Sequence, residues 1–239
     1  MKIYDLYIVA LIPARCGSKG IPHKNIKLYK NKPLLVHSID IAKECNYIKE
    51  VYVSTDSTEY QNIAIENGAH VTPLRPHNIS DDLSPDIDTF LYFIEMFKTN
   101  NLKIPDLIVH LRPTYPNRKI DILNICIEKF IENYEKYDSL RTVVKIDKTP
   151  IKMYFIENDN LIPYFDKYKD FIEPYNQARQ NFPDTYLHNG CIDIVKTEII
   201  INNKLLSGTK IYPYIMNENE TYDIDNMDDF NKSENKIIK

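Results

Sequence analysis

Apolar runs of strand length alternate with helix-period patterns over most of the first 146 residues, and this alternation constrains the fold more than any other feature. Leu6 to Ile12 and Leu107 to Leu111 are continuously apolar, as expected of strands that are buried on both faces of a sheet. Amphipathic stretches over residues 33–45 and 84–98 have helical spacing. A β-α-β alternation favours an α/β fold with a mostly parallel central sheet and helices on both faces.

The same patterns predict the remaining elements. Strands are expected over 51–54, 70–73, 139–146 and 189–195, and helices over 57–67, 120–134 and from 226 onward. Ser84 is expected to cap the helix over 84–98, with Pro85 at its first position.

From about Asp147 to Tyr186 the alternation fails, and the chain becomes rich in Tyr, Phe, Pro and charged residues. We interpret residues 1–239 as a single domain and this stretch as an inserted arm. Apolar patches on such an arm need a partner surface.

Composition and charge exclude several classes of protein. The net charge is -4 and the pI is about 5.9, whereas nucleic-acid-binding domains are usually basic, so we expect no nucleic-acid partner. No stretch approaches the roughly 20 apolar residues that span a bilayer, so we expect no membrane association. The four cysteines form neither a CxxC pair nor a Cys/His cluster, which favours reduced thiols in a cytoplasmic protein.

Residues 12–26 read IPARCGSKGIPHKNI and follow the first expected strand. In a parallel sheet, ligands bind beyond the carboxyl ends of the strands. Glycines let backbone N–H groups approach an anion closely, while Arg15 adds a planar donor and Lys19 a mobile charge. This phosphate loop, residues 12–26, therefore favours a polyphosphate ligand. Its spacing matches neither GxxxxGK[ST] nor GxGxxG, so a basic surface loop remains the alternative.

The phosphate loop resembles the signature IPARxGSKGIxxKNI of the CMP-sugar synthetases, which include acylneuraminate cytidylyltransferases and relatives acting on legionaminic and pseudaminic acids, with CMP-Kdo synthetases as more distant cousins. The resemblance implies a Rossmann-like nucleotidyltransferase fold, CTP as substrate, Mg²⁺ as cofactor, and catalytic roles for Arg15 and Lys24. It also implies a set of nucleotide-binding residues: Ala14, Arg15, Gly17, Ser18, Lys19, Lys24, Asn25, Arg75 and Asp86. Of these, Asp86 stands where some sialic acid enzymes have Ser.

Later motifs continue the resemblance. VSTDS at 53–57 matches the family's second strand end, and its residues are read mainly as a helix cap. LRPTYP at 111–116 resembles LQPTSP, with Arg112 in place of Gln and Tyr115 in place of Ser. Arg112 suits a carboxylate ligand, and a solvent-exposed residue at a strand end is the alternative.

The stretch over 177–190 matches RQxxPxxYxxNG, and shortly after it Asp193 replaces a common Tyr. Lys152 lies in a turn that looks like the family's HPxK. The resemblance implies that the sugar acid is contacted by Arg112, Thr114, Lys152, Arg179, Asn189 and Asp193. It also identifies residues 147–186 as similar to a dimerisation arm that covers the neighbour's sugar site, so we expect a homodimer.

Asp223-Ile224-Asp225 matches the family's DID motif. Alternate residues of an extended segment point the same way, and two carboxylates can hold a hard divalent cation. An acidic turn that caps the last helix is the alternative. Beside the phosphate loop, the pair favours a Mg²⁺ site at Asp223 and Asp225.

Together the motifs predict a cytidylyltransferase that converts CTP and a nonulosonic (sialic-acid-like) acid into a CMP-sugar and pyrophosphate. Two alternatives stay open. Arg112 and Asp193 motivate a transferase for another keto sugar acid, of the Kdo type, and a nucleotide-binding protein that has lost catalysis is the other. His110 and His188 are expected to be structural.

Overall fold

A computed structural model describes residues 6–217, 220 and 222–235. Its centre is a seven-stranded sheet in the order β13-β7-β12-β6-β1-β4-β5. The strands are β1 (Ile8–Pro13), β4 (Glu50–Ser54), β5 (His70–Val71), β6 (Leu107–His110), β7 (Ser139–Ile146), β12 (Thr185–Lys196) and β13 (Ile211–Met216). Every neighbouring pair is parallel except those of β12, which runs antiparallel to β6 and β7. The mostly parallel sheet is confirmed, with one reversed strand that the sequence pattern does not indicate.

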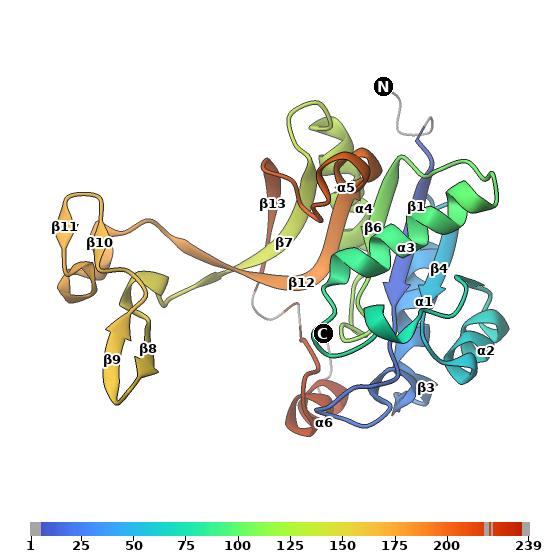
Figure 1. Cartoon of the computed structure of the whole chain (residues 1–239), viewed down its shortest axis with the longest axis horizontal. Coiled ribbons are helices and arrows are strands. Elements are labelled where there is room, and N and C mark those ends of the chain that lie inside the picture. The colour runs from blue at the N-terminus through green and yellow to red at the C-terminus, as the bar shows by residue number, and fades with distance from the viewer. Residues whose placement is uncertain (1–5, 218–219, 221, 236–239) are drawn as a thin grey trace.

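Helices cover both faces of the sheet, as expected (Figure 1). The core on one face includes α1 (Leu34–Glu44), α2 (Thr58–Glu66) and α4 (Ile120–Glu132), and that on the other includes α3 (Asp86–Thr99) and α5 (Thr197–Asn203).

Strand β1 shows why its sequence is continuously apolar. Ile8, Ala10 and Ile12 pack into the first core, whereas Val9 and Leu11 pack into the second. Alternate residues of a strand point to opposite faces, so a strand covered on both sides has no solvent-facing position for a polar residue.

Parallel pairing of β1 with β4 and β6 brings the carboxyl ends of these strands to one edge of the sheet. Backbone hydrogen bonds fasten the segments that follow them: Ala14 N donates to Ser54 O at 2.9 Å, and Leu111 N donates to Leu11 O at 3.1 Å. The phosphate loop, the segment after β4 and the turn after β6 therefore meet at this edge.

The segment between β7 and β12 forms an arm. It contains two hairpins, built from β8 (Tyr154–Glu157) with β9 (Asn160–Pro163) and from β10 (Lys167–Tyr168) with β11 (Phe171–Ile172). The long strands β7 and β12 carry the arm away from the body (Figure 1). Several large apolar side chains on it are exposed, among them Ile156, Leu161, Tyr164 and Ile172.

Helix α3 begins later than the sequence indicates. Its first residue is Asp86 and Pro85 precedes it, so the expected cap at Ser84 is wrong. The Ser84 hydroxyl instead donates to Asp81 Oδ1 at 2.8 Å and organises the preceding loop. Ser57 does cap α2, because its oxygen accepts from Tyr60 N at 3.4 Å.

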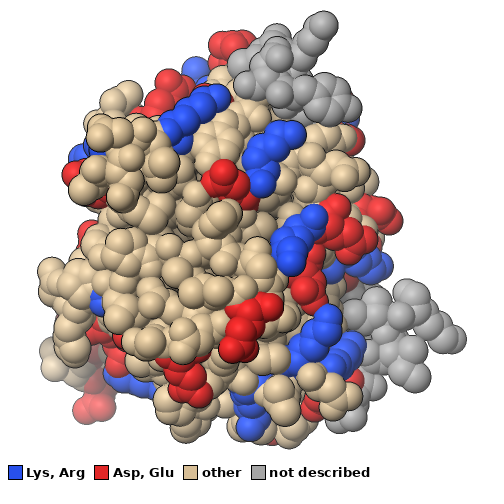
Figure 2. Space-filling model, turned by 90° about the vertical axis from the view of Figure 1, so that its right-hand side faces the viewer, with Lys and Arg blue, Asp and Glu red and all other residues tan. Residues whose placement is uncertain are grey.

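The sequence patterns did not indicate α5 or β13. Besides several short 3-10 helices, the structure contains a short hairpin of β2 (Leu28–Tyr29) with β3 (Lys32–Pro33), and α6 (Met227–Asn235). Within the described residues, no helix is long and apolar enough to cross a membrane. On the face opposite the arm, basic and acidic side chains are interspersed (Figure 2).

Candidate active site

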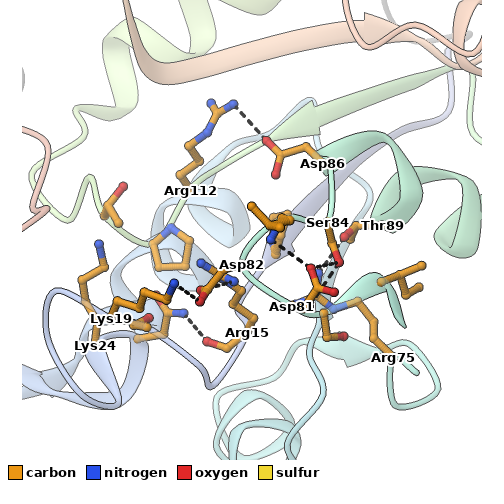
Figure 3. Close-up of a pocket in the computed structure, with 18 of the residues that line it drawn as sticks. Arg15, Lys19, Lys24, Arg75, Asp81, Asp82, Ser84, Asp86, Thr89 and Arg112 are labelled. Atoms are coloured by element: carbon orange, nitrogen blue, oxygen red, sulfur yellow. Dashed lines mark hydrogen bonds and ion pairs between the residues drawn. The ribbon is translucent and has the colours of Figure 1, made fainter. Parts of the chain in front are cut away.

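A cleft of about 620 Å³ opens where the phosphate loop, the segment before α3 and the turn after β6 come together (Figure 3). Most of the expected site residues line it: Arg15, Ser18, Lys19, Lys24, Asn25, Arg75, Asp86, Arg112, Thr114 and Asp225. Segments up to 200 residues apart in sequence thus form one polar cleft, which holds cations and carboxylates at close range.

Asp82, from the segment before α3, lies between two cations of the phosphate loop. Its carboxylate pairs with Arg15 at 2.8 Å and with Lys19 at 2.6 Å (Figure 3). All three side chains remain partly exposed. A carboxylate held by two cations stands in for a phosphate group, so the loop has the geometry of an anion site.

Asp56 anchors the start of the phosphate loop. Its Oδ1 accepts from Cys16 N at 2.8 Å, and its Oδ2 from Cys16 Sγ at 3.2 Å. The side chain that caps α2 is that of Ser57, so the interpretation of Asp56 as mainly part of a helix cap is wrong for this residue. Burial raises the pKa of the Cys16 thiol, with the hydrogen bond to Asp56 as a further cause.

The far end of the phosphate loop is fastened to the DID segment. Lys24 Nζ donates to Ile224 O at 2.8 Å and lies 3.7 Å from Asp225 Oδ1. Ile224 is fully buried beside Ile21 and Phe230, so an apolar anchor separates the two acidic residues. The buried Ile224 explains how a short segment near the end of the chain is held against a loop near its beginning.

Gly20 is required by this close approach. A Cβ at that position would lie 2.4 Å from the backbone oxygen of Asp225, closer than real Cβ contacts. At Gly17 no atom of the described residues, apart from its own chain neighbours, lies within 4 Å of the corresponding position, so that side of the loop is open. The close approach therefore restricts the side chain at position 20 but not at position 17.

Arg75 is a buried cation with unused hydrogen-bond donors. Its side chain lines the cleft and the residue is 7% exposed, with Nη1 donating to Thr89 Oγ1 at 2.6 Å. Within the described part of the chain, its Nε and Nη2 atoms have no hydrogen-bond partner. Burial lowers the pKa of Arg75, and the charge of Asp56 partly opposes this. Buried donors are rarely left unpaired, so this guanidinium is suited to a ligand that supplies acceptors.

Arg112 and Asp193 form an ion pair, with Nη1 and Oδ2 2.7 Å apart. Burial alone would raise the pKa of Asp193, but a hydrogen bond from His188 and the charge of Arg112 hold it well below its ordinary value. Burial would lower the pKa of Arg112, and the charge of Asp193 raises it instead. Arg112 is therefore neither a solvent-exposed residue at a strand end nor a free cation waiting for a ligand carboxylate.

Asp193 also contacts the two histidines that the sequence assigned to structure. His188 Nε2 lies 2.8 Å from Asp193 Oδ1, and His110 Nδ1 lies 3.9 Å from Asp193 Oδ2. Burial lowers the pKa of His110 far below its ordinary value, so this ring is neutral at pH 7. Both rings help to surround the Asp193 carboxylate.

Asp223 and Asp225 are the two carboxylates predicted to hold a cation, and Asp225 lines the cleft whereas Asp223 does not. Burial raises the pKa of Asp223, and the neighbouring charge of Asp225 raises it further, while hydrogen bonding by Thr114 and Tyr115 acts in the opposite direction. No group of three or more candidate ligands occurs among the described residues. Mg²⁺ commonly uses one or two carboxylates together with substrate phosphates. Asp225 lies beside the phosphate loop and Asp223 beside Thr114 and Tyr115, so these two carboxylates are candidates for a site of this kind.

Seven of the expected site residues do not line this cleft: Ala14, Gly17, Lys152, Arg179, Asn189, Asp193 and Asp223. Ala14 is buried in the core, and Asn189 Oδ1 accepts from Thr142 Oγ1 at 2.6 Å and from Cys191 N at 3.1 Å, which stabilises the irregular part of β12. Lys152 and Arg179 lie on the arm, where they line a separate hollow of about 260 Å³. Within one chain, the expected sugar-binding set is therefore split: Arg112 and Thr114 line the cleft, Lys152 and Arg179 lie on the arm, and Asn189 and Asp193 line neither hollow.

The cleft is also lined by Asp82, Thr89 and His110, for which the sequence predicted no site role. Thr89 follows Asp86 by one helical step of three residues, a spacing that places them on the same side of α3. Helical spacing was therefore a usable signal for Thr89. No local pattern identifies Asp82 as the partner of two loop cations, because that pairing depends on the tertiary fold.

Comparisons with known proteins identify relatives that cover most of the chain. A family model described as Cytidylyltransferase matches residues 9–154. The chain is 31% identical to the CMP-N,N'-diacetyllegionaminic acid synthase of Legionella pneumophila, over 91% of this chain and 90% of that protein. It is 28% identical to a pseudaminic acid cytidylyltransferase of Campylobacter jejuni, over 92% of each chain. An N-acylneuraminate cytidylyltransferase of Streptococcus agalactiae is 29% identical, and the match spans 93% of this chain but 51% of that protein.

Solved structures of low sequence identity share the fold. A CMP:2-keto-3-deoxy-manno-octonic acid synthetase complexed with CTP has a TM-score of 0.67 at 16% identity, covering 95% of this chain and 97% of that chain. A 4-diphosphocytidyl-2C-methyl-D-erythritol synthase of Anaerococcus prevotii has a TM-score of 0.58 at 12% identity, covering 96% and 97%. The resemblance to the CMP-sugar synthetases is confirmed by the sequence matches, and the chain belongs to the cytidylyltransferase family.

Proposed function

We propose that this protein transfers the cytidylyl group of CTP to a nonulosonic (sialic-acid-like) acid and releases pyrophosphate. The observation that carries the proposal is the cleft itself. The cations Arg15, Lys19 and Lys24 lie on its phosphate-loop wall, and Arg112 and Thr114 line the wall after β6. Such an arrangement suits a triphosphate next to a polar acceptor.

The reaction needs positioning more than covalent help from the protein. The anomeric hydroxyl oxygen of the acid attacks the α-phosphorus, a new phosphorus–oxygen bond forms, and the bond to the bridging oxygen of pyrophosphate breaks. The hydroxyl proton leaves to the surroundings. Arg15 and Lys24 stabilise the negative charge that develops on the phosphoryl oxygens and the leaving group.

Asp223 and Asp225 would hold the Mg²⁺ ion that the family resemblance implies. When bound, such an ion neutralises charge on phosphate oxygens. Lys24 touches the same segment through Ile224 O and Asp225, so nearby positive charges would meet the phosphates together. This placement favours Lys24 as a residue that orients the triphosphate against the DID segment.

CTP binding requires an exchange at the phosphate loop. Asp82 holds Arg15 and Lys19, so a triphosphate that uses these cations must displace its carboxylate.

We assign Arg75 to the nucleotide, because its unpaired donors need acceptors that the described residues do not supply. The adjacent ring nitrogen and carbonyl oxygen of cytosine offer two such acceptors, whereas uracil carries an N–H at that ring nitrogen.

We further propose that the protein acts as a homodimer. Lys152 and Arg179 are on the arm, away from their own cleft in one chain, and the arm exposes apolar side chains such as Ile156 and Ile172. A neighbouring protomer would cover these side chains and receive Lys152 and Arg179 near its sugar site. Light scattering tests this proposal, and a fully active monomer would contradict it.

A pyrophosphate-release assay with CTP, Mg²⁺ and a panel of nonulosonic acids tests the function. Arg15→Ala is expected to lower the rate about a hundred-fold or more. Lys27→Ala is the matched control, since Lys27 follows the phosphate loop but does not line the cleft. Unchanged turnover of Arg15→Ala would reject its catalytic role.

The same assay decides between the alternatives. Turnover with eight-carbon Kdo-type acids and with no nine-carbon acid would support the second candidate, which is motivated by the departures from the family pattern at Arg112 and Asp193. Tight CTP binding without turnover of any acid would support a protein that has lost catalysis.

A further inference from the structure

Three positions at which this chain departs from its family pattern meet in the structure. Asp86, Arg112 and Asp193 form a linked row, with Arg112 between the two carboxylates. Resting on the proposed cytidylyl transfer, we propose that a substrate hydroxyl group bridges Arg112 Nη2 and Asp86 Oδ2, while Asp193 positions Arg112 for this contact. The row then selects substrates by that hydroxyl.

One half of the Arg112 guanidinium is fixed by hydrogen bonds. Arg112 Nη1 donates to Asp193 Oδ2 at 2.7 Å and to Gly190 O at 3.1 Å. The Asp193 carboxylate is itself held by His188. Arg141 Nε lies 4.0 Å from Asp193 Oδ1, and Arg141 does not line the cleft. These contacts fix the plane of the guanidinium and leave Nη2 on the side of Asp86.

The other half of the Arg112 guanidinium, which carries Nη2, is less constrained. Arg112 Nη2 and Asp86 Oδ2 lie 3.6 Å apart across the cleft wall (Figure 3), which is longer than a hydrogen bond. Asp86 keeps 55% of its side chain exposed, and it has no hydrogen-bonded side-chain partner within the described residues. A donor and an acceptor therefore face the cleft side by side with neither fully used.

A hydroxyl group fits this pair of donor and acceptor. A hydroxyl oxygen can accept from Nη2 and donate to Oδ2 at the same time. A ligand carboxylate would meet two fixed carboxylates around one guanidinium and would be repelled. The N–H and C=O of an ordinary acylamino group point in opposite directions, so it cannot satisfy both atoms from one side. The row thus favours a hydroxyl over the carboxylate that an isolated Arg112 suggests.

Either substrate of the proposed reaction can supply the hydroxyl: the ribose of CTP or the sugar acid. Asp86 lies three residues before Thr89, which holds Arg75, so it neighbours the proposed nucleotide wall as well as Arg112. One set of assays compares CTP with 2′-deoxy-CTP and 3′-deoxy-CTP. A second set compares a sugar acid that the enzyme turns over with analogues that each lack one hydroxyl.

For the wild-type protein, we expect one of these analogues to lose about ten-fold or more in kcat/KM relative to its parent. In Asp86→Ala the discrimination should fall to about two-fold, whereas Asp88→Ala should keep it. Asp88 is the matched control because it lies in the same first turn of α3 and does not line the cleft. Asp86 is exposed, so its replacement leaves the fold intact.

Asp193→Asn tests the positioning role. It should raise KM for the parent substrate without changing KM for the deoxy analogue, a split that a general loss of structure would not produce. Equal use of every parent and analogue by the wild type, or discrimination that persists in Asp86→Ala, overturns the inference.

Thermal-shift measurements distinguish a failure of the proposed cytidylyl transfer from a failure of the bridging hydroxyl. The shift produced by CTP and its deoxy analogues, and by the acids in the presence of CMP, reports binding without turnover. Absent turnover combined with hydroxyl-dependent shifts that Asp86→Ala removes would refute the proposed function and retain the bridging hydroxyl. Turnover without hydroxyl dependence would refute only the bridge.

Discussion

Arg112 and Asp193 lie 81 residues apart in sequence and form an ion pair of 2.7 Å at the wall of the cleft. Each appears in the sequence as an isolated departure from the family pattern. In the structure they are one unit, because Asp193 is buried and Arg112 supplies its counter-charge. The pair accounts for a buried carboxylate and changes what Arg112 can bind.

Asp193→Asn is expected to lower the free energy of unfolding at pH 7 by about 2–4 kcal/mol, because it leaves Arg112 without its partner. The folded-state pKa of Asp193 lies below the unfolded value, so its stabilisation is fully present above about pH 4 and is lost as the pH falls through the folded value. Urea unfolding of both proteins should show a difference that shrinks towards acid pH. A difference that stays constant below about pH 4 would reject this linkage.

Gly20→Ala is expected to lower the free energy of unfolding by about 1–3 kcal/mol and to reduce turnover, because the new Cβ collides with Asp225 O. The collision must shift either the phosphate loop or the DID segment. Gly17→Ala is the paired control, since its Cβ meets open space and should leave stability nearly unchanged. Chemical denaturation and pyrophosphate release measure the two effects. Equal stability loss in both variants would argue against the close approach at Gly20.

Arg75→Met is expected to maintain or increase stability while weakening CTP binding at least ten-fold. Among the residues that the structure describes, its buried guanidinium has one hydrogen-bonded nitrogen, so removing the charge relieves a desolvation cost. The same donors are proposed to bind the nucleotide, so affinity falls. Thermal unfolding and CTP titration should move in opposite directions, and a large loss of stability with unchanged affinity would assign Arg75 to structure.

Asp82→Asn is expected to tighten CTP binding about three-fold, since Arg15 and Lys19 no longer need to be released from a carboxylate. The effect should be largest at low salt, where the charge interactions are least screened. Asp81→Asn is the control, because Asp81 bonds within its own loop to Ser84. Calorimetric titration with CTP compares the variants, and weaker binding by Asp82→Asn would show that Asp82 assists the nucleotide instead.

Local signals predicted much of the fold and the phosphate loop. The apolar run of β1 and the helical spacing of α1 and α4 identified elements whose bounds shift by only a few residues. The reversed β12 was not predicted, because an apolar strand has the same sequence pattern in either direction. The short α5 and β13 also gave no clear periodic signal.

Interactions between distant segments were harder to predict. Lys24 and Ile224, Arg15 and Asp82, and Arg112 and Asp193 each join parts of the chain that only the tertiary fold brings together. The residue types and motifs indicated that these side chains belonged to a site. They did not indicate which charges were already paired, and that distinction decides what Arg75 and Arg112 can bind.

The most direct test of the central claim is ³¹P NMR of the wild-type protein with CTP, Mg²⁺ and a nonulosonic acid. The account predicts that the three CTP signals are replaced by pyrophosphate and one phosphodiester signal, whose phosphorus is bonded to the anomeric oxygen of the acid. Loss of CTP without a phosphodiester, or no loss with any acid in the panel, would contradict it.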